Sequence, residues 1–387
     1  TYLQSIDYTY NEMGWLRQIN QSSLSTPSLS FPNNTCSPSF PAPTNAGIAA
    51  DPDVHDLFFQ ELRYDSVFTT TSGGFSGMPA NLQKNGNIAQ TAWRIKGRDM
   101  QAYNYTYDYL DRMLNSTYYN VAGTTATASN RYNENLTYDE KGNISTLNRR
   151  GYANTGVNTC TYDIIDNLNY TYNSEKSRLT SISDVANATY RPYGFSPGSG
   201  GVGYGYDANG NLKSDTYKGI TNINYNHLNL PTIIQWGTSK SIEYTYDAGG
   251  NKLRKIVKTG VNTNAVKDYV AGIEYDTIPG SRIIESIYHS EGRYYNHTGT
   301  VTPTWRLEYS LRDHLGNTRI SFSDLNSDGK IDVPSEILQE NQYYAFGLEH
   351  EGNWKMTNIA EDMPYTYNGK EWNSEHNLKL YDYGARW

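Results

Sequence analysis

One short pattern recurs along this chain and constrains its fold more than any other feature. In its best example, Tyr244–Asn251 (YTYDAGGN), two tyrosines stand two residues apart, so both rings project from one face of a strand. Asp247 can accept hydrogen bonds from the backbone amides ahead of it, and Gly250 tolerates a positive φ. The pattern therefore predicts a β-hairpin with a three-residue connection that is closed by a left-handed glycine.

The same turn recurs at loose intervals. Full copies of Asp-x-x-Gly-Asn stand at Asp139–Asn143, Asp207–Asn211, Asp247–Asn251 and Asp313–Asn317. Partial copies that keep the leading Tyr-x-Tyr stand at Tyr8–Asn11, Tyr105–Asp108, Tyr170–Asn173 and Tyr365–Asn368. A unit of about 20 residues holds two strands and two turns, and units of this length bury their faces only against neighbouring units. We therefore expect an array of stacked hairpins.

These Tyr-Asp, Gly-Asn hairpins resemble the RHS or YD-repeat proteins, and the resemblance runs from about Leu62 to the end of the sequence. It implies an all-β fold in which the hairpins form a curved, spiralling sheet that is part of a shell. From Tyr288 onward the sequence resembles the repeat-associated core domain of that family, in a form similar to versions from Bacteroidota-like bacteria. The segments that carry this second part of the resemblance are Leu311–Phe322, Glu340–Leu348 and Tyr365–Trp387.

The resemblance divides the chain into three expected parts. Residues 1–61 are a degenerate repeat with a Ser- and Pro-rich excursion, whose prolines oppose any central strand. Residues 62–287 are the YD-repeat sheet, and residues 288–387 are part of the core domain. In the family this core leads to an Asp-Pro motif where the chain cleaves itself, and the present sequence stops before any such motif. No catalytic residue is carried over, and we expect that this segment is not an enzyme.

Composition narrows the fold and the partners. Tyrosine is the outlier, with 36 residues against 9 Phe and 7 Trp, and it suits a sheet with one hydrated face. The net charge of −8 comes without a Lys/Arg block, so we expect no nucleic-acid partner. No apolar run reaches the roughly 18 residues of a membrane span. Cys36 and Cys160 are too few for a disulfide framework or a four-Cys zinc site, and we do not expect a bridge between them.

One loop in the core-like region has the spacing of a calcium site. Oxygen-bearing residues occupy its positions 1, 3 and 5, and Gly329 occupies position 6. The predicted ligands are Asp324, Asn326, Asp328, Lys330 through its carbonyl, Asp332 and Glu336. Position 12, where a bidentate acid normally stands, is Ser335, and the acid comes one residue late. The alternative is an Asp/Asn-rich turn without an ion, because these residues also form such turns unaided.

Two other motifs match functional patterns without the context that the function needs. Gly194–Gly198 (GFSPG) fits the serine-hydrolase elbow around Ser196, but Pro197 has no backbone N–H to donate to an oxyanion. Gly198–Gly203 matches a dinucleotide fingerprint, but no βαβ unit surrounds it. We expect loops in both places and a structural turn role for His314.

The resemblance implies a structural shell that encloses and delivers a C-terminal toxin or effector. The alternative is a cell-surface adhesin whose Tyr-rich sheet binds glycans or proteins, and a hydrolase is the least favoured class. The expected partners are the rest of the same polypeptide or an effector, together with secretion-system or outer-membrane surface proteins, and the expected location is secreted or on the cell surface. Because the chain supplies too few strands to surround a cargo domain, we expect an open, right-handedly twisted arc whose edges pair with preceding repeats or with another protein.

Overall fold

The computed structural model describes residues 3–20, 56–68, 75–154, 160–195, 203–352 and 363–384. Within these residues the regular structure is antiparallel β-strand with short 3-10 turns and without an α-helix. The predicted all-β fold is therefore confirmed, with large antiparallel sheets that are not closed by hydrogen bonds. The described residues contain no helix that is long and apolar enough to cross a membrane.

Two large sheets account for most of the strands. The first contains β1 (Tyr8–Tyr10), β2 (Leu16–Ile19), β3 (Phe58–Arg63), β4 (Gln90–Ile95), β5 (Met100–Tyr107), β6 (Met113–Ala122), β7 (Thr125–Ala128), β8 (Glu134–Tyr138), β9 (Ile144–Asn154), β10 (Cys160–Tyr172) and β11 (Leu179–Asp184). The second contains β14 (Asn222–Tyr225), β15 (Pro231–Trp236), β16 (Lys240–Tyr246), β17 (Lys252–Thr259), β18 (Asn262–Val270), β19 (Ile273–Ile278), β20 (Ser281–His289), β21 (Gly292–Asn296), β22 (Trp305–Arg312), β23 (Thr318–Phe322) and β24 (Ile337–Glu340).

Smaller elements connect and extend these sheets. They are η2 (Arg191–Tyr193), β12 (Tyr204–Tyr206) paired with β13 (Leu212–Asp215), η3 (Tyr367–Gly369), β25 (Trp372–Asn373), η4 (Glu375–Asn377) and β26 (Leu380–Tyr381). Strands pair with their neighbours in sequence order, and β7 alone branches off this path to pair with β6. This order is the one expected when each sheet is built from consecutive hairpins.

The repeated turn has the predicted geometry. In the example at Asp247, the Asp247 N–H donates to the Asn251 carbonyl at 3.0 Å, and the Gly250 N–H donates to the Asp247 carbonyl at 3.1 Å. One carboxylate oxygen of Asp247 accepts the N–H groups of Gly249 and Asn251, both at 2.8 Å. Gly250 has a φ of 86°, and the register of β16 and β17 shifts beside the turn, as in a hairpin closed by a bulge.

Copies without glycine keep the same backbone path. Asp111, Lys176 and Asn229 take the left-handed position in three degenerate turns, with φ of 63°, 50° and 57°. Residues other than glycine can therefore occupy this position of the turn, although a side chain makes the positive φ less favourable.

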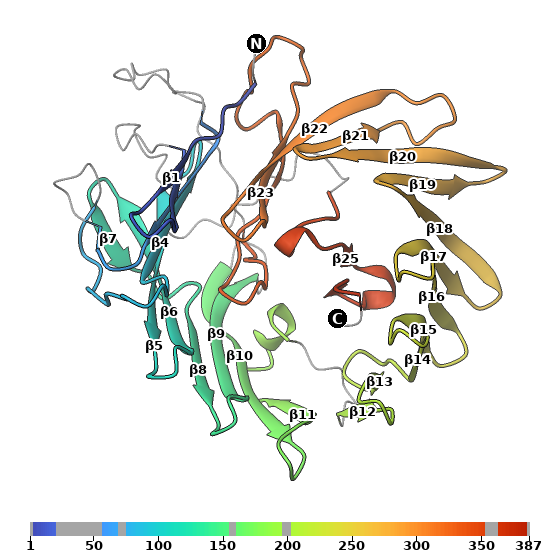
Figure 1. Cartoon of the computed structure of the whole chain (residues 1–387), viewed down its shortest axis with the longest axis horizontal. Coiled ribbons are helices and arrows are strands. Elements are labelled where there is room, and N and C mark those ends of the chain that lie inside the picture. Colours follow the sequence, from blue (N-terminus) through green and yellow to red (C-terminus); the bar gives the residue numbers. More distant parts are fainter. Residues whose placement is uncertain are drawn as a thin grey trace.

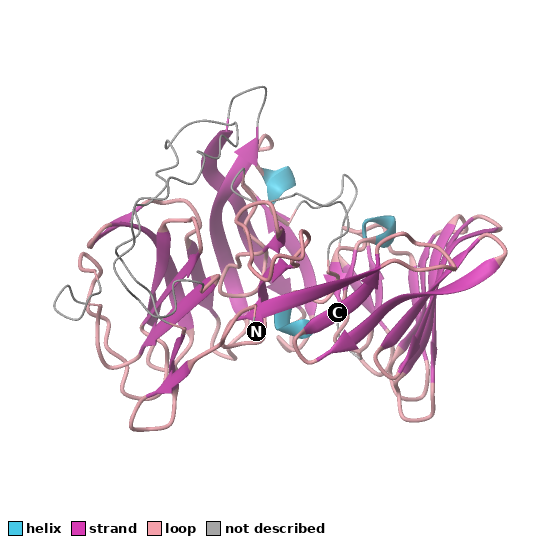
Figure 2. Ribbon diagram, turned by 90° about the horizontal axis from the view of Figure 1, so that it is seen from above, coloured by secondary structure: helices cyan, strands magenta, loops and turns pink. Residues whose placement is uncertain are grey.

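The strands succeed one another around a central space (Figure 1). The first sheet forms one side of this ring and the second sheet forms the other, with β12 and β13 between them. Seen from above, the two sheets stand as separate walls and the described C-terminal residues lie between them (Figure 2). The curved and twisted arrangement of the strands agrees with the expected arc. It follows from the twist between neighbouring strands, added up over many consecutive hairpins.

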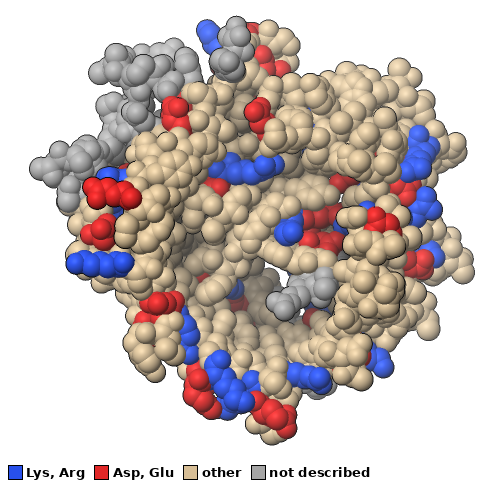
Figure 3. All heavy atoms as spheres, viewed as in Figure 1, with Lys and Arg blue, Asp and Glu red and all other residues tan. Residues whose placement is uncertain are grey.

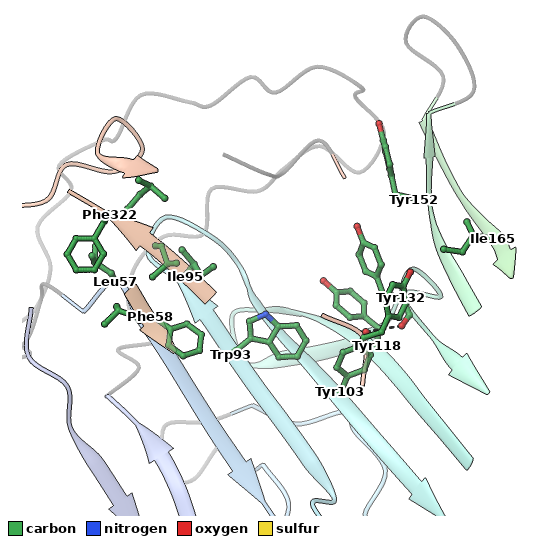
Figure 4. Close-up of a cluster of buried hydrophobic side chains, with 14 residues drawn as sticks. Leu57, Phe58, Trp93, Ile95, Tyr103, Tyr118, Tyr132, Tyr152, Ile165 and Phe322 are labelled. Carbon is green, nitrogen blue, oxygen red and sulfur yellow. Dashed lines mark hydrogen bonds between the residues drawn. The ribbon is translucent and has the colours of Figure 1, made fainter. Parts of the chain in front are cut away.

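The end of the second sheet packs on the first sheet through side chains. Phe322 of β23 lies beside Leu57 and Ile95 in the close-up of the largest apolar cluster (Figure 4). The same cluster contains Phe58 and Trp93 from β3 and β4, and all five residues are at most 2% exposed. The arc therefore meets itself by side-chain packing, whereas we expected its ends to remain apart. The described C-terminal segment with β25 lies in the space that the strands surround (Figure 1).

The expected three-part division of the chain remains a prediction. Strand β3 runs across the first expected boundary, at residues 61 and 62, and β20 runs across the second, at residues 287 and 288. In the part of the chain that the structure describes, buried apolar side chains gather in four clusters along the ring instead of one thick core. Such separate clusters suit a sheet in which each hairpin packs mainly on its neighbours.

Candidate functional site

The candidate functional site is the inner face of the second sheet together with the C-terminal segment that covers it, residues 363–384. Figure 1 shows this segment, which carries β25, inside the ring. Leu378 of this segment is fully buried among Ile223, Ile234 and Ile242, which come from β14, β15 and β16. The apolar contact fixes the C-terminal end of the described chain on the inner side of the wall.

A buried charge network holds the same segment. Glu371, which is 4% exposed, accepts hydrogen bonds from Lys255 Nζ at 2.8 Å and from the Tyr269 hydroxyl at 2.9 Å. Lys252 also bonds Glu371, and its Nζ lies 2.7 Å from a carboxylate oxygen of Asp382. The network thus joins β17 and β18 to residues on both sides of β25. Figure 3 shows acidic and basic side chains gathered beside the central hollow.

The network sets the ionisation of its central carboxylate. Burial by itself raises the pKa of Glu371, but the nearby Lys255 and Lys252 outweigh it and lower the pKa to about 2. The same carboxylate raises the pKa of Lys252, against the effect of burial. At neutral pH the Glu371 carboxylate is therefore ionised. It lies between Lys252 and Lys255 and anchors the C-terminal segment.

A second polar contact lies where the C-terminal segment begins. The Tyr365 hydroxyl donates to Glu274 of β19 at 2.6 Å, and Lys267 of β18 pairs with the other oxygen of Glu274 at 3.2 Å. Burial raises the pKa of Tyr365 well above its ordinary value, and the charge of Glu274 adds to this effect. At neutral pH the Tyr365 phenol therefore keeps its proton and donates its hydrogen bond to Glu274.

Buried ion pairs also join the two ends of the arc. Arg98, in the turn between β4 and β5, bonds Glu340 of β24 at 2.8 Å, and both side chains are at most 3% exposed. Farther along the first sheet, Arg149 lies between the buried carboxylates of Glu134 and Asp166, at 2.8 and 2.6 Å. Burial raises the pKa of Glu134, and Arg149 opposes the shift. These charges are paired inside the contact between the first sheet and the C-terminal third of the chain.

A cavity of about 230 Å³ remains in this contact, lined by aromatic and polar side chains. Its lining includes Trp93 and Tyr105 from the first sheet and Arg319 from β23. The Arg319 guanidinium lies 5.2 Å from the Trp93 ring centroid, in a cation–π contact. His314 lines the same cavity, and its N–H donates to Gln60 at 3.0 Å, so the residue expected in a turn also contacts β3.

The predicted calcium loop folds around its own backbone amides. Asp324 accepts the N–H of Gly329 at 2.9 Å, and Asn326 accepts the N–H of Asp328 at 2.8 Å. Asp328 in turn accepts the N–H of Lys330 at 2.9 Å. The side-chain oxygens at alternate positions therefore bind backbone amides of their own loop, which the alternative without an ion also predicts.

The remaining predicted ligands fit less well. Glu336, whose residue is 3% exposed, accepts the N–H groups of Leu325 and Asp332 at 2.7 and 2.8 Å, so both its oxygens already serve the backbone. Asp332 approaches Asn326 Nδ2 at 3.4 Å. No group of three or more His, Cys, Asp or Glu side chains converges on one point within the part of the chain that the structure describes. Calcium binding by this loop, with Glu336 among the ligands, remains a prediction.

Two sequence motifs lie outside the described residues. Ser196 and Pro197 of the elbow motif lie in the segment 196–202, as does nearly all of the fingerprint motif Gly198–Gly203. Cys36 lies in the segment 21–55, so a pairing with Cys160 is not described either. Gly194 and Phe195, at the start of the elbow motif, come directly after η2, and the Phe195 N–H donates to Asp166 at 2.6 Å.

Sequence reasoning missed a hydrogen bond that links successive hairpins. A tyrosine that precedes the connection of its hairpin donates its hydroxyl to a backbone carbonyl of the preceding hairpin, at 2.6–3.0 Å. Seven of these tyrosines stand directly before a tight turn, and Tyr64 stands before the long connection from β3 to β4. The eight bonds are Tyr64 to Leu16, Tyr107 to Ile88, Tyr138 to Met113, Tyr172 to Ile144, Tyr206 to Leu179, Tyr225 to Leu212, Tyr246 to Pro231 and Tyr343 to Thr318. We call these eight residues the hairpin-linking tyrosines. The signal in the sequence was the constant place of tyrosine before the turn, which we interpreted through its ring alone.

Comparisons with known proteins fit this architecture. No protein-family model matches the chain, and no curated protein matches it. The chain is similar to solved structures titled "Crystal Structure of TcdB2-TccC3-TEV", "Crystal Structure of TcdB2-TccC3-Cdc42" and "Crystal Structure of TcdB2-TccC3", each at 16% identity, with TM-scores of 0.51, 0.52 and 0.52. These are chains of a toxin complex built from RHS-repeat proteins. This chain has an RHS-like fold.

The match covers very different shares of this chain and of the chains in the solved structures. It covers 99%, 98% and 98% of this chain but only 17%, 17% and 18% of those chains. The present chain therefore spans less than a fifth of their length. At this identity the similarity concerns the fold, which is a wall of consecutive antiparallel hairpins.

Proposed function

We propose that this chain is a wall segment of an RHS-type shell, in a secreted or surface-displayed bacterial protein, and that the shell encloses and delivers a C-terminal effector. The observation that carries the proposal is the position of the C-terminal segment on the inner face of the wall. Leu378 and Glu371 anchor it there through one apolar and one ionic contact. The RHS-like fold supports the same proposal.

The anchoring determines where a polypeptide joined to the C-terminal end would start. A chain joined after Trp387 would leave from the C-terminal end, which Figure 2 marks between the two walls. It would therefore enter the enclosed side before it reached solvent. In this proposal the wall acts by confinement, without a catalytic residue, and its outer surface is the side available to secretion-system or outer-membrane proteins.

A second candidate, binding at a cell surface, is favoured by one feature of the outer face. Ile273, Ile287, Tyr294 and Leu307 stand opposite one another on four neighbouring strands, and Tyr294 is 44% exposed. They lie on the face opposite to Glu274, which points towards the C-terminal segment. Apolar side chains in a row on an exposed face are typical of a contact surface.

The test compares two fusions of one flexible reporter peptide that contains a protease site. The peptide is joined after Trp387 in one fusion and before Thr1 in the other. If the wall encloses a polypeptide joined to its C-terminal end, the reporter after Trp387 should be cleaved at least about ten-fold more slowly, because cleavage then requires the wall to open. Equal cleavage rates would contradict enclosure and would favour the surface-binding candidate. Glu371→Gln, which loosens the anchor, should speed cleavage only in the fusion after Trp387.

A further inference from the structure

The hairpin-linking tyrosines have a strict order along the chain. In each of the eight bonds, the tyrosine belongs to the later hairpin and the carbonyl belongs to the earlier one. In seven of the bonds the acceptor is the first residue after the earlier turn, and Tyr107 donates to Ile88, near the end of the long connection between β3 and β4. Pro231, for example, stands directly after the turn of Asn226–Leu230 and accepts from Tyr246 at 3.0 Å. The bond therefore connects a turn to the turn that precedes it.

The acceptor carbonyl is available because the backbone ladder does not reach it. Strands β15 and β16 pair only as far as Ile233 and Glu243, so the carbonyl of Pro231 lies beyond the last ladder pair. The tyrosine hydroxyl satisfies this group, which would otherwise face the next hairpin unpaired. The bond also forms where the sheets are interrupted, since Tyr206 of β12 reaches Leu179 of β11. It is thus a contact between hairpins that is independent of the ladder.

Tyr10 has the position of a hairpin-linking tyrosine but has no acceptor in the described residues. It stands directly before the turn at Asn11, whose N–H donates to the Trp15 carbonyl at 2.9 Å and whose carbonyl accepts the N–H of Gly14 at 2.9 Å. The eight bonded tyrosines are buried or half-buried, whereas Tyr10 is 61% exposed. Tyr8, on the same face of β1, is 53% exposed.

The edge of β1 is open on the side that Tyr10 would link. Among the described strands, β1 pairs with β2 alone, so its other edge presents unpaired N–H and C=O groups. After the first hairpin of each large sheet, the strand that opens a hairpin pairs with the preceding hairpin, as β16 pairs with β15, whereas β12 and β14 begin new sheets. The open edge of β1 therefore offers the two kinds of group that join one hairpin to the preceding one: backbone groups for the ladder and a tyrosine hydroxyl.

We propose that the edge of β1 docks the second strand of a further hairpin of the same repeat, which is joined to the N-terminal side of this chain. The first residue after the turn of that hairpin gives its carbonyl to Tyr10. This inference rests on the proposed function, because it names the partner of the wall at its open edge. It makes the wall continue beyond β1 in the register that the eight internal bonds define.

The order of the bonds selects this occupant over a second copy of the chain. If β1 paired with β1 of another copy, the facing strand would also be the one that precedes its turn. Such a strand offers another tyrosine and no carbonyl that comes after a turn, so Tyr10 would stay without an acceptor. Since the acceptor comes earlier in sequence in all eight bonds, the missing hairpin is expected before Thr1 in the same polypeptide.

The test supplies the missing hairpin from the chain's own sequence. A copy of residues 222–236, which contains β14, its turn and β15, is joined before Thr1 through a flexible linker of about 12 residues, which spans roughly 20 Å. Amide hydrogen exchange at Tyr8–Tyr10 is then compared between the extended and the original chain. We expect exchange in β1 to slow about ten-fold or more in the extended chain, because its open edge becomes paired.

The tyrosine is tested by Tyr10→Phe in both chains. In the extended chain, Tyr10→Phe should speed amide exchange in β1 about five-fold, because it removes one hydrogen bond of about 1 kcal/mol. In the original chain it should change nothing. Tyr225→Phe at its native position is the matched control, because it removes an internal bond and should speed local exchange equally in both chains.

Three results would overturn the inference. They are unchanged β1 exchange in the extended chain, an equal effect of Tyr10→Phe in both chains, and a dimer of the original chain that protects β1 and is insensitive to Tyr10→Phe. The last would assign the edge to a second copy. Each of these results leaves the reporter-cleavage experiment unaffected, since that experiment measures enclosure at the C-terminal end. Failure of the docking inference is therefore distinguishable from failure of the proposed function.

Discussion

Single carboxylates organise the loops of this protein by binding backbone amides. In the turn at Asp313, one oxygen accepts the N–H groups of Leu315 and Asn317, both at 3.0 Å. In the predicted calcium loop, Asp324 and Asp328 accept amides of the same loop in the same manner. The two motifs share this local chemistry, in which a carboxylate oxygen accepts hydrogen bonds from backbone amides of its own loop.

The calcium loop yields a residue-scale prediction. If Asp324, Asn326, Asp328 and Asp332 bind the ion, Asp328→Ala should lower the melting temperature in calcium and leave it unchanged in chelator, because the ion binds only the folded loop. Differential scanning calorimetry in both buffers measures this. Asp65→Ala, in another turn, serves as the control that should not respond to calcium. Identical melting of the unmodified chain in calcium and in chelator would show that the loop holds no ion.

At the scale of elements, the short C-terminal strands are held by side chains more than by their own ladder. Strands β25 and β26 have two residues each, too few to be stable alone. Their place on the wall comes from Leu378 in an apolar cluster and from Glu371 between Lys252 and Lys255. The segment is thus the part of the chain whose position depends most on charge.

This dependence predicts a pH effect on stability. Glu371 has a pKa of about 2 in the folded protein, below its ordinary value of 4.5. A carboxyl whose pKa is lowered by folding stabilises the protein above the ordinary value and loses this effect as the pH falls towards the folded value. We therefore expect a contribution of about 3 kcal/mol at pH 7 that disappears between about pH 5 and pH 2.

The measurement is urea unfolding as a function of pH. Glu371→Gln should lower the free energy of unfolding by about 3 kcal/mol at pH 7 and should flatten its decline below pH 5. The exposed Glu291 offers a control, since Glu291→Gln should leave both the value and the pH profile as they are. An unchanged decline in Glu371→Gln would assign the acid sensitivity to other groups.

At the scale of the whole molecule, contacts between residues far apart in sequence hold the ring together. Arg98 and Glu340 are 242 positions apart and form a buried pair at 2.8 Å. Phe322 and Leu57 join the same two regions in the apolar cluster. The ring is thus a property of the folded chain as a whole, since neither hairpin repeats nor turns require its ends to meet.

The pair predicts a large effect of a single substitution. Arg98→Ala leaves the Glu340 carboxylate buried without its cation, so the free energy of unfolding should fall by about 3–5 kcal/mol. Arg17→Ala is the control, because Arg17 lies 4.0 Å from Glu61 with its side chain 47% exposed, and its loss should change stability by less than about 1 kcal/mol. Equilibrium denaturation measures both. Similar small losses in the two variants would show that the pair does not hold the ring.

The sequence by itself determined the hairpins, their antiparallel order and the turn geometry. These features are local. The carboxylate of Asp247 accepts backbone amides of its own turn, and Gly250 allows the positive φ that the turn needs, so the same residues at the same spacing form the same turn elsewhere in the chain. The order of the strands is a consequence, since consecutive hairpins have only their neighbours to pair with. The all-β class and the RHS-like wall were predictable for this reason.

Only the tertiary structure decided what the repeats enclose and where their ends lie. Glu371 and Lys255 are 116 positions apart, and no spacing along the chain indicates that they meet. The sequence also does not indicate which carbonyl accepts the hydrogen bond of each hairpin-linking tyrosine, because every residue has a backbone carbonyl. The path of the ring depends on the twist summed over many strands, and a small difference per strand decides whether the two ends of the wall come into contact.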